Sequence, residues 1–155
     1  MKIYDVVFGE LDYDYIWSKD TTMNYFGVKT PITLIIEGDE DGVFDDDQYS
    51  AYQSLMEDWE EIQQNLLQPI LNYYLQKRHE LGYDIAFNES YPFVDTTEQL
   101  KKMMTLDSIV VSYGDLNKER DIGFLFSCTW DSENGLGIRL LDEKVVDVGY
   151  QDVAI

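Results

Sequence analysis

The sequence predicts an α+β fold in which an antiparallel sheet, built from N-terminal strands and a C-terminal meander, packs on one long kinked or broken helix and a short second helix. Apolar residues alternate with period two near both ends of the chain, which indicates strands. Between these regions apolar residues recur at steps of three and four, which indicates a helix. The order of strands, helices and strands favours antiparallel pairing over βαβ units.

The N-terminal region, residues 1–36, is predicted to be β structure. Within it Tyr13, Tyr15 and Trp17 alternate with acidic residues, which is the pattern of a single half-buried strand whose aromatic side chains share one face. Residues 32–36 are almost entirely apolar and are expected to form a compact strand.

An acidic segment follows, and we call residues 37–47 the acidic loop. Its two glycines and dense charge indicate a turn. Asp45, with Gln48 three positions later, has the spacing of a capping box, so a helix is expected to begin at about Gln48. The candidate partner-binding carboxylates of the acidic loop are Asp39, Glu40, Asp41, Asp45, Asp46 and Asp47.

A long helical region is predicted from about Gln48 to His79. Pro69 lies inside it and is expected to kink the helix or split it in two, because proline lacks the backbone donor. A short helix is expected at about residues 97–104. The C-terminal strands are predicted at residues 109–113, 122–130, 135–141 and 144–150. Because no linker or repeat interrupts the chain, residues 1–155 are predicted to form a single domain.

The net charge of the chain limits the classes of molecule that it is expected to bind. It has 31 Asp and Glu against 11 Lys and Arg, a formal net charge of −20. Such a field repels nucleic acids and anionic membranes and attracts basic proteins. The single cysteine forms no intrachain disulfide and fits a reducing compartment. With no signal peptide and no apolar run of membrane length, the predicted location is the cytoplasm.

No catalytic motif is present, so we predict no catalytic residue, no cofactor and no dedicated metal site. The single histidine, His79, lies at a polar helix end, and Cys128 lies among the aromatic residues of a core-facing strand. The acidic loop does not match the spacing of an EF-hand. Two alternatives remain: a metal-dependent enzyme using clustered carboxylates, in the acidic loop or around Asp131 and Glu133, and a structural module without a discrete site.

The aromatic residues Tyr13, Tyr15 and Trp17 have two interpretations. Packing in the core is the first. The second is a recognition surface, because exposed Tyr and Trp ringed by carboxylates suit contact with a basic protein. On the second interpretation these three residues bind the partner together with the acidic loop.

The C-terminal region contains the pattern Trp-Asp-x-Glu-x-Gly-Leu-Gly, in which Trp130, Asp131, Glu133, Gly135 and Gly137 are the candidate motif residues. This hairpin resembles that of a family of small uncharacterised bacterial proteins, many of which carry a histidine where this chain has Asn134. The resemblance implies an acidic cytosolic protein of the immunity type, which neutralises a toxin. The net charge adds the expectation that this partner is basic, such as a nuclease or another toxin with a cationic active site. The motif also suits a tight turn that Asp131 caps itself.

The net charge generates a prediction about stability. Self-repulsion between carboxylates should weaken the fold at low ionic strength, because the Debye length falls from about 30 Å at 0.01 M salt to about 8 Å at 0.15 M. We expect the melting temperature, followed by circular dichroism, to rise over this range of sodium chloride. A melting temperature that does not change with salt would contradict it.

Overall fold

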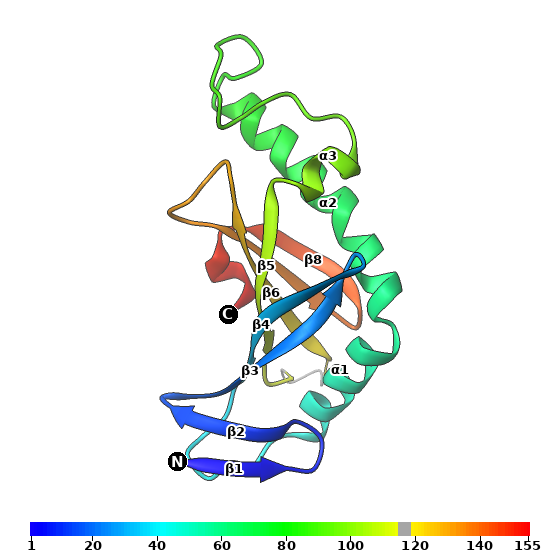
Figure 1. The fold of residues 1–155 in the computed structure, drawn as a ribbon, viewed down its shortest axis with the longest axis vertical. Coiled ribbons are helices and arrows are strands. Elements are labelled where there is room, and N and C mark those ends of the chain that lie inside the picture. Colours follow the sequence, from blue (N-terminus) through cyan, green and yellow to red (C-terminus); the bar gives the residue numbers. More distant parts are fainter. Residues whose placement is uncertain (115–118) are drawn as a thin grey trace.

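The computed structural model describes residues 1–114 and 119–155 (Figure 1). The strands in these residues are β1 (Lys2–Asp5), β2 (Gly9–Asp14), β3 (Ile16–Tyr25), β4 (Val28–Ile36), β5 (Met104–Val111), β6 (Asp121–Cys128), β7 (Leu136–Leu141) and β8 (Lys144–Gly149). The helices are α1 (Asp46–Glu57), α2 (Trp59–Glu80), α3 (Thr97–Lys101) and the short 3-10 helix η1 (Gln151–Ala154). The strands form one sheet in sequence order, from β1 to β8.

The sheet is mixed, so the predicted antiparallel sheet is wrong. β4 and β5 pair in parallel, with Leu34 opposite Ile109 and Ile36 opposite Val111, while the other neighbouring strands pair antiparallel. Parallel neighbours need a long crossover, and the chain supplies it with α1, α2 and α3. The paired ends of the two strands are apolar at Leu34–Ile36 and Ile109–Val111, which suits strands in the middle of a sheet.

The helices also differ from the prediction of one long kinked or broken helix and a short second helix. In the described part of the chain, α1, α2 and α3 are separate helices of 12, 22 and 5 residues. The break between the first two falls at Asp58, and α2 continues through Pro69. The buried neighbours Leu66 and Ile70 hold α2 against the sheet, and this packing offsets the one missing hydrogen bond at the proline.

The start of α2 is determined by contacts with the sheet. The indole N–H of Trp59, its first residue, donates to the carbonyl of Asn24 at 2.6 Å, and its ring stacks on Phe124 with 6.0 Å between centroids. No helix within residues 1–114 and 119–155 is both long and apolar enough to cross a membrane.

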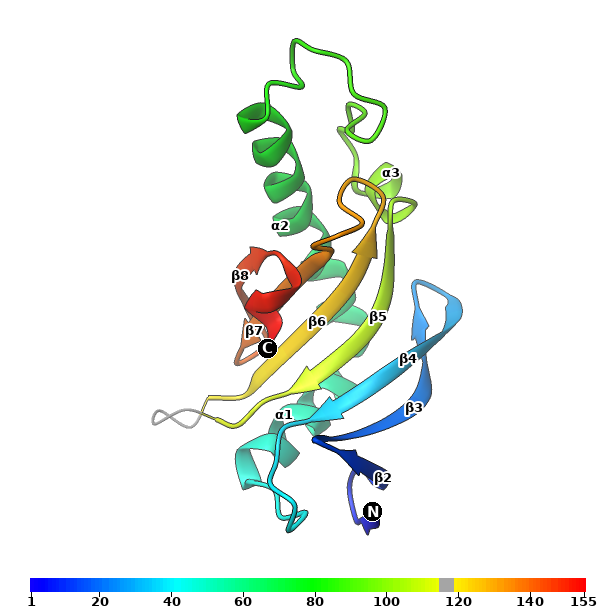
Figure 2. The same cartoon turned by 90° about the vertical axis from the view of Figure 1, so that its left-hand side faces the viewer.

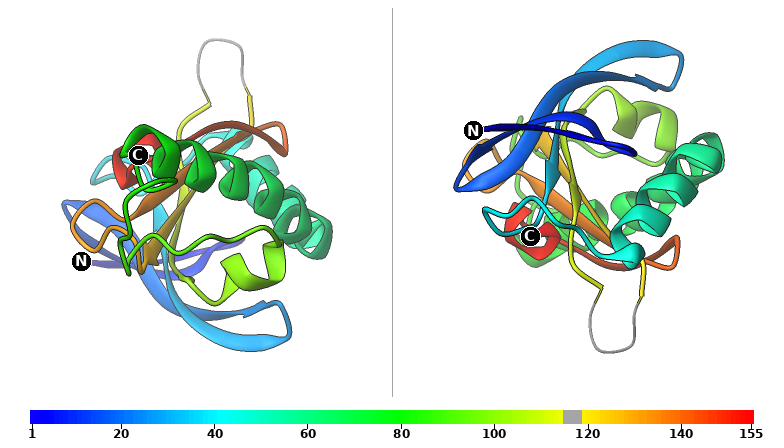
Figure 3. Two further views of the ribbon diagram at one scale, coloured as in Figure 1. Left: turned by 90° about the horizontal axis from the view of Figure 1, so that it is seen from above. Right: turned by 90° about the horizontal axis from the view of Figure 1, so that it is seen from below.

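The core lies between the concave face of the curved sheet and the two longer helices (Figure 3). Trp17, Phe124 and Phe126 are fully buried on the sheet side, and Leu66 and Ile70 are buried on the helix side. Each such side chain stabilises the fold by about 1.5–3 kcal/mol relative to an exposed one. The sheet and helices are therefore held together by aromatic and branched aliphatic packing.

The N-terminal strand prediction needs a correction. The predicted single strand containing Tyr13, Tyr15 and Trp17 is wrong, because Tyr15 has a φ of 65° and lies in the turn between β2 and β3. Tyr13 therefore belongs to β2 and pairs with Trp17 of β3 across the hairpin. Alternation continues in the sequence through the turn, so periodicity alone cannot reveal the reversal of the chain.

The opposite face of the sheet is covered at one end by η1, which lies over β6 and β7 (Figure 2). Gly123 permits this close approach, because a Cβ at this position would lie 2.1 Å from the carbonyl oxygen of Ala154. The side-chain amide of Gln151 also donates to the carbonyl of Phe126 at 3.1 Å. The C-terminal segment is therefore docked directly on the sheet backbone.

Gly123→Ala is expected to destabilise the protein by about 1–3 kcal/mol, because the added methyl group overpacks the contact between β6 and η1. Urea unfolding followed by circular dichroism measures the change. Thr105→Ala, at an exposed position on β5, is the control and should change stability by less than about 0.5 kcal/mol. Equal stabilities of the two variants would show that η1 does not dock as described.

Candidate functional site

The parallel pair of strands defines where a site is expected. The chain leaves the C-terminal end of β4 into the acidic loop, and it leaves the C-terminal end of β5 at Ser112, Tyr113 and Gly114. Both connections lie at the same edge, the kind of place where sheets with parallel strands commonly bind ligands. The acidic loop and its neighbours at this edge are therefore the candidate functional site.

Gln48, in the first turn of α1, ties this edge together. Its side chain is fully buried and its Nε2 donates to the carbonyl of Glu37 at 2.7 Å and to that of Val111 at 3.4 Å. Its Oε1 accepts from the backbone N–H of Asp45 at 2.9 Å, which completes the predicted capping box. One side chain thus joins the ends of β4 and β5 to the start of α1.

Aromatic side chains of the core hold the acidic loop in place. The indole N–H of Trp17 donates to the carbonyl of Asp39 at 2.7 Å. Phe44, a buried residue within the loop, packs edge-on against Trp17 and Phe8, with ring centroids 6.3 and 5.4 Å away. The backbone of the loop is therefore anchored in the core at its middle as well as at its two ends.

The carboxylates of the acidic loop point to solvent. All six candidates are exposed except Asp47, which is half-buried. No ion pair joins any of them to a lysine or arginine within residues 1–114 and 119–155. Burial raises the pKa of the Tyr113 phenol, and four neighbouring carboxylates raise it further, those of Asp39, Glu37, Asp45 and Asp41. The four carboxylates are thus close enough together for their negative charges to act jointly on the Tyr113 phenol.

The three predicted aromatic residues separate into different environments. Trp17 is fully buried, which favours the interpretation of core packing for this residue, and it supports the acidic loop from the core. Tyr13 is half-buried and packs on Trp17, with 4.9 Å between ring centroids. Tyr15 is 90% exposed at the tip of the β2–β3 turn. Among these three, Tyr15 offers the most surface to a partner.

Sequence reasoning missed further polar residues at this edge. Asp121, at the start of β6, is buried and ion-paired with Arg139 of β7 at 2.6 Å. Burial raises the pKa of the Glu37 carboxyl, and the charge of Asp121 raises it further. Together with Tyr113 these residues line a pocket of about 200 Å³. The pair is diagonal across β6 and β7, so only knowledge of the strand register would have revealed it.

The residues of the motif hairpin make contacts that stabilise the fold. Trp130 is buried against Tyr74, with 4.9 Å between ring centroids, and Asp131 accepts from the backbone N–H of Asn134 at 3.0 Å. A Cβ at Gly137 would lie 2.5 Å from the carbonyl oxygen of Tyr150. The remaining motif residues are Gly135, which is buried with a φ of 61°, and the exposed Glu133.

Cys128 and the clustered carboxylates are the groups with the most potential for enzyme chemistry. Cys128 is buried, and burial raises the pKa of its thiol to about 11, so it is not a ready nucleophile. Within the described residues, no three or more His, Cys, Asp or Glu side chains are grouped so that they could hold a metal ion.

A larger pocket of about 660 Å³ lies between the β3–β4 turn and the start of α2. Its walls include Trp59, Phe26 and Lys101. The ammonium of Lys101 is already paired with Glu98 at 2.8 Å and lies 4.6 Å from the centroid of the Phe26 ring. This cation is therefore engaged by the fold, and the other charged groups of the lining are the carboxylates of Glu60 and Glu61.

Comparison with known proteins places the chain at the level of a family. Residues 7–155 match the family described as a domain of unknown function (DUF6985). The match includes the acidic loop, the helices and the C-terminal strands. The expected resemblance to an uncharacterised family is confirmed to this extent. No curated protein and no solved structure matches the chain.

Proposed function

The chain belongs to the family described as a domain of unknown function (DUF6985), and from this premise we propose that it is a binding protein whose acidic loop docks a basic protein. The observation that carries the proposal is a set of exposed carboxylates without an ion pair in residues 1–114 and 119–155, on a loop tied to the core through Trp17, Phe44 and Gln48. A surface that is already ordered loses little conformational entropy when it binds.

The charge of the loop supports a cationic partner. The first 47 residues contain twelve Asp and Glu and three Lys, and 3 − 12 gives −9. A dense field of one sign accelerates encounter with a partner of opposite charge and repels phosphates. The exposed Tyr15 adds an aromatic contact of the kind that contributes strongly to protein interfaces.

A narrower form of the proposal concerns the kind of partner. A bacterial immunity or inhibitor protein in the cytoplasm would need a preorganised acidic surface to cover the cationic active site of a toxin or nuclease. The acidic loop meets that requirement because it is negatively charged and its backbone is held in place by the core. The exposed carboxylates carry this narrower proposal, and the geometry of the described residues gives no comparable support to the metal-dependent enzyme.

The triple variant Asp39→Asn, Asp41→Asn and Asp46→Asn tests the proposal. Affinity capture from the lysate of the source organism at low salt, with elution by a salt gradient and mass spectrometry, is expected to retain one basic protein in near-stoichiometric amount. The triple variant should bind that protein at least roughly tenfold more weakly, because three charges facing the partner are lost.

The control removes the same charge elsewhere, with Glu57→Gln, Glu60→Gln and Glu61→Gln, which are exposed around the junction of α1 and α2. It should keep its affinity within about twofold. Capture of many unrelated basic proteins, or an equal loss in both triple variants, would instead show that the charge serves solubility.

A further inference from the structure

The segment after α2, residues 81–95, exposes large apolar side chains at the end of the molecule far from the acidic loop (Figure 1). Ile85 is 98% exposed, Phe87 is 91% exposed and Phe93 is 65% exposed. Single exposed apolar residues are ordinary on protein surfaces, but three large ones in one short segment mark an interaction site.

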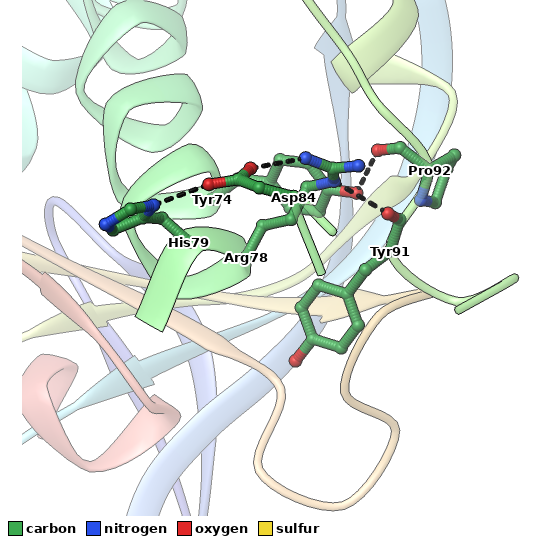
Figure 4. Close-up of polar contacts among 6 residues, drawn as sticks. All are labelled: Tyr74, Arg78, His79, Asp84, Tyr91 and Pro92. Carbon is green, nitrogen blue, oxygen red and sulfur yellow. Dashed lines mark hydrogen bonds and ion pairs between the residues drawn. The ribbon is translucent and has the colours of Figure 1, made fainter. Parts of the chain in front are cut away.

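A polar network holds this segment against the end of α2 (Figure 4). The Arg78 guanidinium donates from Nε to the carbonyl of Tyr91 at 2.9 Å and pairs with Oδ1 of Asp84 at 2.6 Å. The other carboxylate oxygen of Asp84 lies 2.5 Å from Nδ1 of His79. The hydroxyl of Tyr74 donates to the carbonyl of Pro92 at 2.5 Å. Both halves of the segment are therefore fastened to one helix.

Aromatic packing fills the inside of the segment, so the exposed residues are not needed there. Tyr91 stacks on Tyr74 with 6.0 Å between centroids, and Tyr83 packs on Tyr91 at 5.0 Å. The backbone amides of Ile85 and Ala86 donate to the carbonyl of Gly82, which closes a turn. Ile85 and Phe87 thus project from an ordered backbone and contribute almost no buried area to the fold.

Carboxylates outnumber cations around these residues. Arg78 and His79 are engaged by Asp84. The ammonium of Lys77 donates to the neutral Tyr150 hydroxyl at 3.0 Å and keeps its positive charge. The exposed carboxylates of Glu80, Glu89 and Asp95 have no ion pair within the described residues. The surface is therefore apolar at its centre and acidic at its rim.

We propose that residues 81–95 form a second docking surface, for a protein that presents an apolar helix face flanked by lysine or arginine. Ile85 and Phe87 would pack on the apolar face, and the acidic rim would meet the basic side chains. A second copy of this chain fits less well, because it is strongly acidic and a stable dimer buries roughly 800 Å² on each side. Anionic membranes are repelled by the same rim.

The test uses a synthetic amphipathic helical peptide of leucine and lysine, which presents an apolar stripe flanked by cations. Binding to the 15N-labelled protein is followed by amide chemical shifts and by fluorescence anisotropy. We expect shift changes in residues 81–95, and at least roughly tenfold weaker binding to that surface by the double variant Ile85→Ser and Phe87→Ser. Val6→Ser, 93% exposed at the other end of the molecule, should bind as the wild type does.

A leucine and glutamate peptide of the same pattern should bind at least roughly tenfold more weakly, because the acidic rim repels it. The acidic-loop triple variant separates the two proposals, since it should still show the shift changes in residues 81–95. The inference is overturned if the double variant binds the peptide as tightly as the wild type, if the shift changes are confined to the acidic loop, or if both peptides bind equally. It is also overturned if the segment binds only phosphatidylcholine vesicles, or if the protein self-associates and the double variant abolishes this self-association.

Discussion

The buried amide of Gln48 joins three parts of the chain that are far apart in sequence. It donates to the carbonyl of Glu37, just after β4, and to that of Val111, the last residue of β5, and it accepts from the backbone N–H of Asp45 at the start of α1. A buried amide of this kind is costly unless its hydrogen bonds are made, so the three elements are held in one arrangement. Gln48 therefore couples the ends of the parallel strands β4 and β5 to the conformation of the acidic loop.

The helical crossover between β4 and β5 places the two proposed surfaces at opposite ends of the molecule. α1 and α2 run along the concave face of the sheet, so the crossover begins with the acidic loop at one end and turns back through residues 81–95 at the other (Figure 1). Each turning region is fastened to a helix end by polar contacts, through Gln48 in one case and Arg78 in the other. Each also projects side chains that the fold does not use.

Features with a local physical cause were predictable from the sequence. The capping box of Asp45 and Gln48 depends on residues three positions apart, and Asp131 caps its own turn in the same way. The candidate carboxylates of the acidic loop follow from composition, and they are exposed, with Asp47 half-buried.

Features that depend on tertiary contacts were not predictable. The parallel pairing joins residues separated by the whole helical crossover, and the helix break at Asp58 depends on a contact between Trp59 and Asn24. Periodicity placed Trp17 on a strand face but could not show that this face is the core. The exposed Ile85 and Phe87 are apolar, so without the fold they resemble core residues.

Gln48 orders the acidic loop, and amide hydrogen exchange in the Gln48→Ala variant measures this effect. The amides to follow are those of Glu37, Asp45 and Gln48, which are hydrogen-bonded at this edge of the sheet. Loss of the buried amide should speed their exchange by at least roughly tenfold, and the amides of β6 and β7 should exchange as in the wild type. Unchanged protection at all three amides would contradict the account.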